Sequence, residues 1–177
     1  MEFIEFPKIS RWSREIIITE KLDGMNGVIY NGIDGEFLVG SRTCWITPST
    51  DMFGFAKWAY EHKQELQQLG HGLHHGEWWG CGIRRGYGLT EKRFSLFNTT
   101  KWGINRPICC HVTSILYQGV LTGDIVDKTL EQLKLHGSYS APTFDRPEGI
   151  VIFHTAANIC FKKTILNDDK PKSKVKG

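Results

Sequence analysis

Short apolar stretches, each bounded by glycine, asparagine or proline, are the feature that most restricts what this chain can fold into. They are rich in Ile, Val, Phe and Tyr, and their length suits β-strands better than helices. The strands predicted in this way occupy residues 15–19, 26–30, 36–40, 94–97, 108–112, 149–154 and 158–165. Because connections such as residues 31–35 are short enough for hairpins, we expect largely antiparallel sheets.

Two segments follow the helical period instead. The first can be capped by Ser49 or Thr50 and ends at Gly70. Its inward face is formed by Phe55, Ala59, His62, Leu66 and Leu69. The second runs over about residues 122–136, with Val126, Leu130 and Leu133 on one face, and Gly137 supplies its stop. Many strands with two helices between them predict an α+β domain.

Length and composition describe one globular domain. The chain has 177 residues, of which 40% are hydrophobic and 23% are charged, which excludes a disordered protein. No apolar run approaches the roughly 18 residues that cross a bilayer, and the N-terminus lacks the basic region of a secretory signal. The five cysteines form no Cys-x-x-Cys pair, so neither a disulfide framework nor a zinc knuckle is indicated. We therefore expect a cytoplasmic protein with no membrane contact.

The basic charge of the chain belongs to its last residues. The net charge is +3, and subtracting the four charges of Lys170, Lys172, Lys174 and Lys176 leaves −1 for residues 1–169. We expect a domain over residues 1–167 and a lysine-rich flexible tail over residues 168–177, with no accessory domain after it. A nucleic-acid partner thus has to be argued from a local patch on the folded part.

The first segment that could carry chemistry is Thr19-Glu20-Lys21-Leu22-Asp23-Gly24-Met25-Asn26-Gly27. A lysine at the end of an apolar strand can be desolvated, which frees its amine as a nucleophile, and Gly24 permits a tight turn or a close approach. The same letters also fit a hairpin that carries a surface lysine, because Asp-Gly is a common hairpin signal.

Three further segments combine charges with apolar or glycine-rich surroundings. Glu77 precedes two tryptophans that we interpret as core, and an Arg84-Arg85 pair follows in a glycine-rich loop that could bind phosphate. Glu148 stands at the mouth of an apolar strand. Lys162 and Lys163 lie within the last strand, where they either meet an anion or face water on a sheet edge.

In their order along the chain these segments resemble the motifs of the covalent nucleotidyltransferases, which are the ATP-dependent RNA and DNA ligases and the mRNA capping enzymes. The matching motifs are Lys21-x-Asp23-Gly24, Ser41-Arg42, Gly76-Glu77, Phe94-x-x-Phe97, Glu148-Gly149 and Phe161-Lys162. The stretch TEKLDGMNG is most similar to the RNA ligase 2 branch. The resemblance covers about residues 15–165.

The resemblance implies a nucleotide pocket between two largely antiparallel sheets flanked by helices, in which Lys21 forms a phosphoamide with AMP. Catalysis would depend on Lys21, Asp23, Glu148 and Lys162. By similarity Glu20 lies at the adenine edge, Phe97 on the base face, and Asn26 near the ribose-phosphate. Two further residues, Arg42 and Glu77, lie at the ribose. Finally, Lys162 contacts the α-phosphate, with Lys163 as a second candidate, and Glu148 lies near a Mg²⁺ or Mn²⁺ ion.

This sequence departs from the family pattern at three places. The usual Lys-x-Lys of the last motif is Lys162-Lys163 here, so the side chain of Lys163 should point to the other face of the sheet. Asn98 stands where an acid commonly follows Phe97. After Lys163 we expect no additional nucleic-acid-binding domain of the kind that many ligases have, so either the catalytic domain suffices or a protein partner supplies the contact with the strand.

The resulting prediction is a minimal ATP-dependent polynucleotide ligase that joins 5′-phosphate and 3′-hydroxyl ends, with RNA favoured over DNA as the substrate. The nearest enzymatic alternatives are a DNA ligase and a capping-type enzyme that transfers GMP. A non-catalytic module that binds nucleotides or RNA ends is the alternative from another class.

Overall fold

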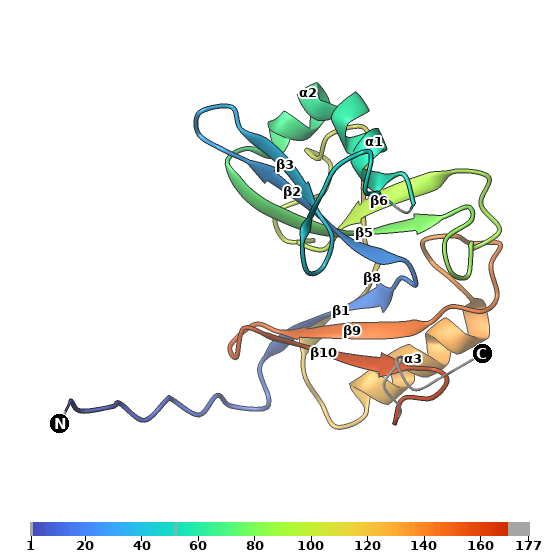
Figure 1. The fold of residues 1–177 in the computed structure, drawn as a ribbon. Helices are drawn as coiled ribbons and strands as arrows, with labels where there is room; N and C mark the ends of the chain where they lie inside the picture. Colours follow the sequence, from blue (N-terminus) through green and yellow to red (C-terminus); the bar gives the residue numbers. More distant parts are fainter. Residues whose placement is uncertain (1, 52, 170–177) are drawn as a thin grey trace.

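The computed structural model describes residues 2–51 and 53–169. From Glu15 onward they form two β-sheets with helices on their outer faces, and the N-terminal segment before it extends away from the sheets (Figure 1). The first sheet has the strand order β10-β9-β1-β8 and is antiparallel throughout. Its strands are β1 (Glu15–Lys21), β8 (Ile115–Val120), β9 (Gly149–His154) and β10 (Ile159–Thr164). In this sheet the first predicted motif lies beside a late one, because Lys21 of β1 pairs with Gly149 of β9.

The second sheet has six strands in the order β4-β3-β2-β5-β6-β7. They are β2 (Met25–Asn31), β3 (Phe37–Gly40), β4 (Trp45–Ile46), β5 (Gly72–Gly80), β6 (Lys92–Leu96) and β7 (Cys110–Val112). Among the strand pairs of the described residues only β6 and β7 run parallel. The prediction of an α+β fold with largely antiparallel sheets is therefore confirmed.

Both helical regions form, but the first differs from its prediction. It begins at Phe55 rather than after Ser49 or Thr50, because the Asp51 carboxylate accepts hydrogen bonds from the backbone N–H groups of Phe53 and Ala56. It is also divided into α1 (Phe55–Glu61), α2 (Lys63–Leu66) and the 3₁₀ turn η1 (Gln67–Leu69). The division falls at His62, whose Nδ1 lies 2.9 Å from the Trp58 carbonyl oxygen.

The second helical region, α3 (Ile125–His136), agrees with its prediction and ends at Gly137, where φ is +81°. Its Leu133 packs with Ile16, Ile18, Ile150 and Ile152 on the outer face of the first sheet. Alternate residues of these strands are thereby left for the opposite face.

A larger core lies between the second sheet and α1, where Phe55, Trp78 and Phe94 are buried. A third, smaller cluster contains Leu22, Trp79, Tyr87 and Ala141 and lies where the two sheets join. The interpretation of Trp78 and Trp79 as core residues is confirmed.

Several strand predictions were incomplete. Three strands, β4, β5 and β8, were not predicted. The predicted strand over residues 108–112 begins only at Cys110, and Ile108 is exposed. No helix in residues 2–51 or 53–169 has the length and apolarity needed to span a bilayer. The four lysines of the predicted tail lie outside the described residues.

Candidate functional site

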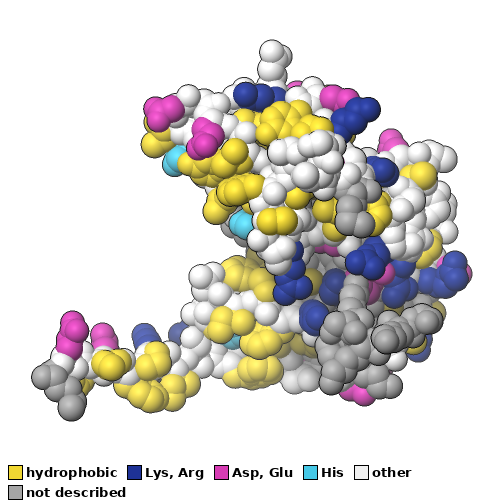
Figure 2. Space-filling model, viewed as in Figure 1, with side chains coloured by type: hydrophobic (Ala, Val, Ile, Leu, Met, Phe, Trp, Pro, Cys, Tyr) yellow, Lys and Arg dark blue, Asp and Glu magenta, His cyan; other side chains and the backbone are white. Residues whose placement is uncertain are grey.

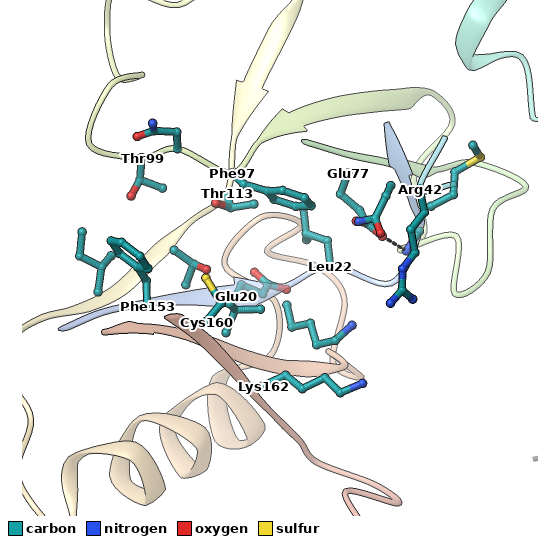
Figure 3. Close-up of a pocket in the computed structure, with 18 of the residues that line it drawn as sticks. Glu20, Leu22, Arg42, Glu77, Phe97, Thr99, Thr113, Phe153, Cys160 and Lys162 are labelled. Atoms are coloured by element: carbon teal, nitrogen blue, oxygen red, sulfur yellow. Dashed lines mark hydrogen bonds between the residues drawn. The ribbon is translucent and has the colours of Figure 1, made fainter. Parts of the chain in front are cut away.

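A cavity of about 760 Å³ opens between the two sheets and is lined by residues of both (Figure 3). Strands β1, β9 and β10 form its floor, and β2, β5 and the segment after β6 supply the opposite side. The expected pocket between the sheets is therefore present. Of the predicted site residues, those that line it are Glu20, Lys21, Asn26, Arg42, Glu77, Phe97 and Lys162.

The floor of the cavity changes from apolar to cationic along the strands. Strand pairing puts Ile17, Phe153 and Cys160 in one row across β1, β9 and β10. The next row on the same face contains Thr19, Val151 and Lys162, and the following one contains Lys21. One end can thus hold a flat apolar ring, and the other can hold an anion.

At the cationic end Lys21 forms an ion pair with Glu148, and its Nζ lies 2.6 Å from Oε2. The Glu148 side chain is only 3% exposed, whereas that of Lys21 is 18% exposed. Gly149 lets the chain approach β10 closely here, since a Cβ on it would lie 2.2 Å from the Lys163 carbonyl oxygen. The close approach fixes Glu148 directly beside the lysine.

On the opposite side Glu77 holds the turn that follows Lys21. Its Oε1 accepts a hydrogen bond from the Gly24 N–H, and its Oε2 accepts one from Asn26 Nδ2, each at 3.0 Å. Arg42 lies beside Glu77 at the rim of the cavity (Figure 3). Together these side chains present a carboxylate, an amide and a guanidinium to one side of a ligand.

Glu20 is buried but keeps a free acceptor. The residue is 1% exposed, and its Oε2 accepts a hydrogen bond from the Ser140 N–H at 2.9 Å. Its Oε1 has no hydrogen-bond partner among the described residues, although Glu20 lines the cavity. Because a buried carboxylate oxygen without a donor is costly, this atom is suited to a ligand N–H group.

The roof contains Phe97, which is 42% exposed and points toward the floor (Figure 3). Its backbone N–H donates to the His75 carbonyl oxygen, which anchors it just after β6. Asn98 also lines the cavity, and its side chain accepts a hydrogen bond from the Lys101 N–H. A planar group could therefore lie between Phe97 and the apolar row of the floor.

Three predicted site residues, Asp23, Glu148 and Lys163, are not on the cavity wall, and Glu148 lies behind Lys21, with which it pairs. Asp23 Oδ2 accepts a hydrogen bond from Arg85 Nε at 3.0 Å, and its N–H donates to the Tyr87 hydroxyl. Burial raises the pKa of Tyr87, which keeps this phenol neutral. Lys163 forms an ion pair with Asp127 of α3 on the outer face of the sheet, and this contact raises the pKa of Lys163.

Sequence reasoning missed the apolar floor formed by Ile17, Val151, Phe153 and Cys160, as well as Thr113 on the opposite side. The sequence does contain a pattern that indicates this floor. Because every second residue of a strand lies on the same face, Ile17 shares a face with Lys21, and Cys160 shares one with Lys162.

The residues fit a divalent metal only in company with a ligand. In the described part of the chain no group of three or more His, Cys, Asp and Glu side chains could hold a metal ion. Magnesium, however, is commonly bound by one or two carboxylates together with substrate phosphates. Glu148, a hard oxygen donor at the cationic end, meets that requirement.

Comparison with known proteins decides the family. The family model described as RNA ligase matches residues 14–166. The chain belongs to the RNA ligase family. This assignment confirms the resemblance and includes all the motif residues from Lys21 to Lys162. A search of curated protein sequences finds no significant match.

Solved structures of RNA ligases from Naegleria gruberi have the same fold as this RNA ligase family chain. A variant with AMP and manganese is 18% identical with a TM-score of 0.63. Another with ATP and manganese is 21% identical with a TM-score of 0.62, and a structure with pyrophosphate is 20% identical with a TM-score of 0.59. Each match covers 86% of this chain and 50% of the Naegleria chain, so the present chain spans about half their length.

Proposed function

We propose that this RNA ligase family chain is an ATP-dependent RNA ligase that works through a lysyl-AMP intermediate. The observation that carries the proposal is the position of Lys21, held by Glu148 at the cationic end of a cavity whose other end is apolar. Such a polarity suits a nucleotide, whose base is flat and apolar and whose phosphates are anionic.

The first step is the transfer of AMP to the protein. The Lys21 amine, after losing a proton, attacks the α-phosphorus of ATP, so that a P–N bond forms, the bond to the β-phosphate oxygen breaks, and pyrophosphate leaves. The Glu148 carboxylate contacts Nζ and can receive the proton. Lys162, two residues from Cys160 on the same face, neutralises the α-phosphate.

The later steps return Lys21 to its starting state. An oxygen of the strand's 5′-phosphate attacks the α-phosphorus, the P–N bond breaks, and the amine regains a proton. The 3′-hydroxyl of a second strand end then loses its proton to water and attacks the 5′-phosphorus. The phosphodiester bond forms, the bond from this phosphorus to the AMP oxygen breaks, and AMP leaves. A Mg²⁺ or Mn²⁺ ion held by Glu148 would supply positive charge to the phosphate oxygens.

The free Glu20 oxygen favours ATP over GTP. Adenine presents an amino group at the edge where guanine presents a carbonyl oxygen. A buried carboxylate oxygen accepts a hydrogen bond from the amino group but repels the carbonyl. Phe97 would then contact the base face, and Arg42, Glu77 and Asn26 the ribose side; all four residues line the cavity, whereas Lys163 does not.

The proposal also includes the nucleic-acid substrate and the cellular compartment of the protein. Family membership favours RNA with 5′-phosphate and 3′-hydroxyl ends over DNA. The thiols of the five cysteines are free, as in proteins of a reducing compartment such as the cytoplasm. That a protein partner contributes further contacts with the RNA strand stays a prediction.

Incubation with magnesium and α-labelled ATP or GTP tests the proposal. We expect label from ATP only, surviving a denaturing gel, and none on Lys21→Ala. The Lys21→Ala variant should still join a pre-adenylylated RNA strand to a 3′-hydroxyl end, because that step does not need the amine. Label from GTP alone would instead indicate a capping-type enzyme. If neither nucleotide labels the folded protein, a non-catalytic binding module is the better description.

A further inference from the structure

The loop of residues 81–91, between β5 and β6, lies next to the segment that follows Lys21. Met25 pairs with Trp78, so the chain beyond Gly80 continues beside Leu22 and Asp23. The Asp23 contacts of Arg85 and Tyr87 confirm this neighbourhood. The loop therefore belongs to the cationic end of the cavity.

The loop is held firmly on both sides of Arg84. Ile83 is fully buried and bridges back to Gly80. Arg85 uses Nε to bind Asp23 and Nη1 to bind the Arg146 carbonyl oxygen, both at 3.0 Å. Since both neighbours are fixed, the backbone of Arg84, with φ at +50°, has a set position.

Tyr87 anchors the rest of the loop. Its ring is fully buried, 4.8 Å from the ring centre of Trp79 and 4.7 Å from that of Phe144. The loop is thus a rigid support for an arginine side chain, and rigid supports favour defined ligand contacts.

Arg84 itself lines the cavity and is exposed. No hydrogen bond or ion pair joins its guanidinium to another side chain within residues 2–51 and 53–169. The other cations of the wall, Lys21, Arg42 and Lys162, all have a role in the proposed function. Figure 2 shows Lys and Arg side chains gathered where the two sheets meet. Among the lysines and arginines that line the cavity, Arg84 is the one to which the proposed function assigns no contact with adenosine or the α-phosphate.

We propose that Arg84 binds the β- and γ-phosphates of ATP and the pyrophosphate that leaves. The inference rests on the proposed function and adds a residue to it. In an in-line displacement the leaving group lies opposite the attacking amine. Lys21 comes from the first sheet, and Arg84 comes from a loop of the second. The planar guanidinium can donate two parallel hydrogen bonds to phosphate oxygens, which a lysine cannot do.

The test compares Arg84→Asn and Arg84→Lys with the wild type. Asparagine tolerates a positive φ, so this change removes the cation without straining the loop. Arg146→Ala is the matched control, because Arg146 is an exposed arginine nearby that does not line the cavity. Circular dichroism confirms that each variant is folded.

In Arg84→Asn we expect the ATP concentration for half-maximal self-adenylylation to rise about tenfold or more, as for loss of a charge-assisted hydrogen bond. The pyrophosphate concentration that drives AMP off the adenylylated protein should rise similarly. Arg84→Lys should recover part of the loss. Joining of a pre-adenylylated RNA strand should stay unchanged, because that step contains no pyrophosphate, and Arg146→Ala should behave as the wild type.

Unchanged half-saturating concentrations of ATP and pyrophosphate in Arg84→Asn would overturn the inference. So would a defect confined to joining of the pre-adenylylated strand, since that result would assign Arg84 to the strand phosphate. If the wild type takes no label, the proposed function fails by itself. Calorimetric titration with magnesium pyrophosphate then still decides the inference, which requires weaker binding by Arg84→Asn.

Discussion

The four consecutive residues from Lys21 to Gly24 place a lysine in the cavity and also pack the junction between the two sheets. Lys21 turns to the cavity and Glu148, whereas Leu22 turns to the cluster with Trp79 and Tyr87. Asp23 binds the loop of residues 81–91, and Gly24 touches the backbone of β5. The position of the lysine is therefore coupled to the packing of the junction between the sheets.

Gly24→Ala tests the close approach of the motif to β5. A Cβ at this position would lie 2.3 Å from the Trp78 carbonyl oxygen and 2.8 Å from the Trp79 Cβ. Because neither atom can easily move, we expect a loss of about 1–3 kcal/mol in the free energy of unfolding. Urea denaturation measures it, and Gly123→Ala, with open space around the glycine, serves as the control. Equal stability of the two variants would contradict the close contact.

Tyr87→Phe tests the hydrogen bond that the Asp23 N–H donates to the phenol. The site is buried, so the N–H would lose its partner, which costs about 1–3 kcal/mol. We expect a lower urea midpoint with an unchanged slope of unfolding free energy against urea. Tyr139→Phe, at a half-exposed tyrosine, should leave the midpoint within error of the wild type. If Tyr87→Phe leaves the urea midpoint unchanged, a water molecule replaces the hydroxyl as the partner of the Asp23 N–H.

At the scale of single elements, the alternation of a strand separates two adjacent lysines. Lys162 of β10 lines the cavity, and Lys163 pairs with Asp127 of α3 behind the sheet. This separation follows from the two-residue period of the strand and could be predicted from the sequence. The partner of Lys163 could not, because it lies on a helix 36 residues earlier.

Lys162→Ala and Lys163→Ala should accordingly differ in activity. Loss of Lys162 removes a cation from the α-phosphate, and we expect labelling by ATP to fall about 100-fold or more. Loss of Lys163 removes an exposed ion pair, so labelling should change little and stability should fall by at most about 1 kcal/mol. Single-turnover labelling rates compare the two, and the reverse order would contradict the register of β10.

Strand β5 and the first helical region show why local sequence patterns do not predict every element. The β5 sequence Gly72–Gly80 contains three glycines and two histidines, which weaken its strand signal, yet it forms the centre of the second sheet between β2 and β6. The helical period from Phe55 to Leu69 is present in the sequence, but it does not predict the break at His62, where φ is −103°. For β5, pairing with both neighbouring strands outweighs its weak local propensity.

At the scale of the molecule, the motifs come together because two sheets face each other across the cavity (Figure 1). The order of the motifs allowed the family, the fold class and seven residues of the cavity wall to be predicted, whereas the apolar floor was not predicted. The contacts that fix the wall were beyond sequence reasoning, since Arg85 is 62 residues from Asp23 and Ser140 is 120 residues from Glu20. No local pattern relates residues at such separations.

Stability of the whole domain should depend on pH through two histidines of the second sheet. Burial lowers the pKa of His74 on β5 and of His111 on β7 from the ordinary value of 6.5. In the unfolded chain both rings take up a proton near pH 6.5, whereas the folded protein resists protonation until the pH is lower. Their contribution to stability is therefore complete above pH 6.5 and is lost as the pH falls through the folded-state pKa values.

Urea unfolding between pH 5 and 7.5 measures this effect. We expect the free energy of unfolding of the wild type to fall as the pH drops below about 6.5, because the unfolded state then binds more protons. His74→Gln should reduce the slope of that fall, whatever it does to stability at pH 7.5, because glutamine does not titrate. His136→Gln, at an exposed histidine of α3, should keep the slope of the wild type. If His74→Gln also keeps the full slope, the proton uptake belongs to another group, and the burial of His74 does not govern the acid sensitivity of the domain.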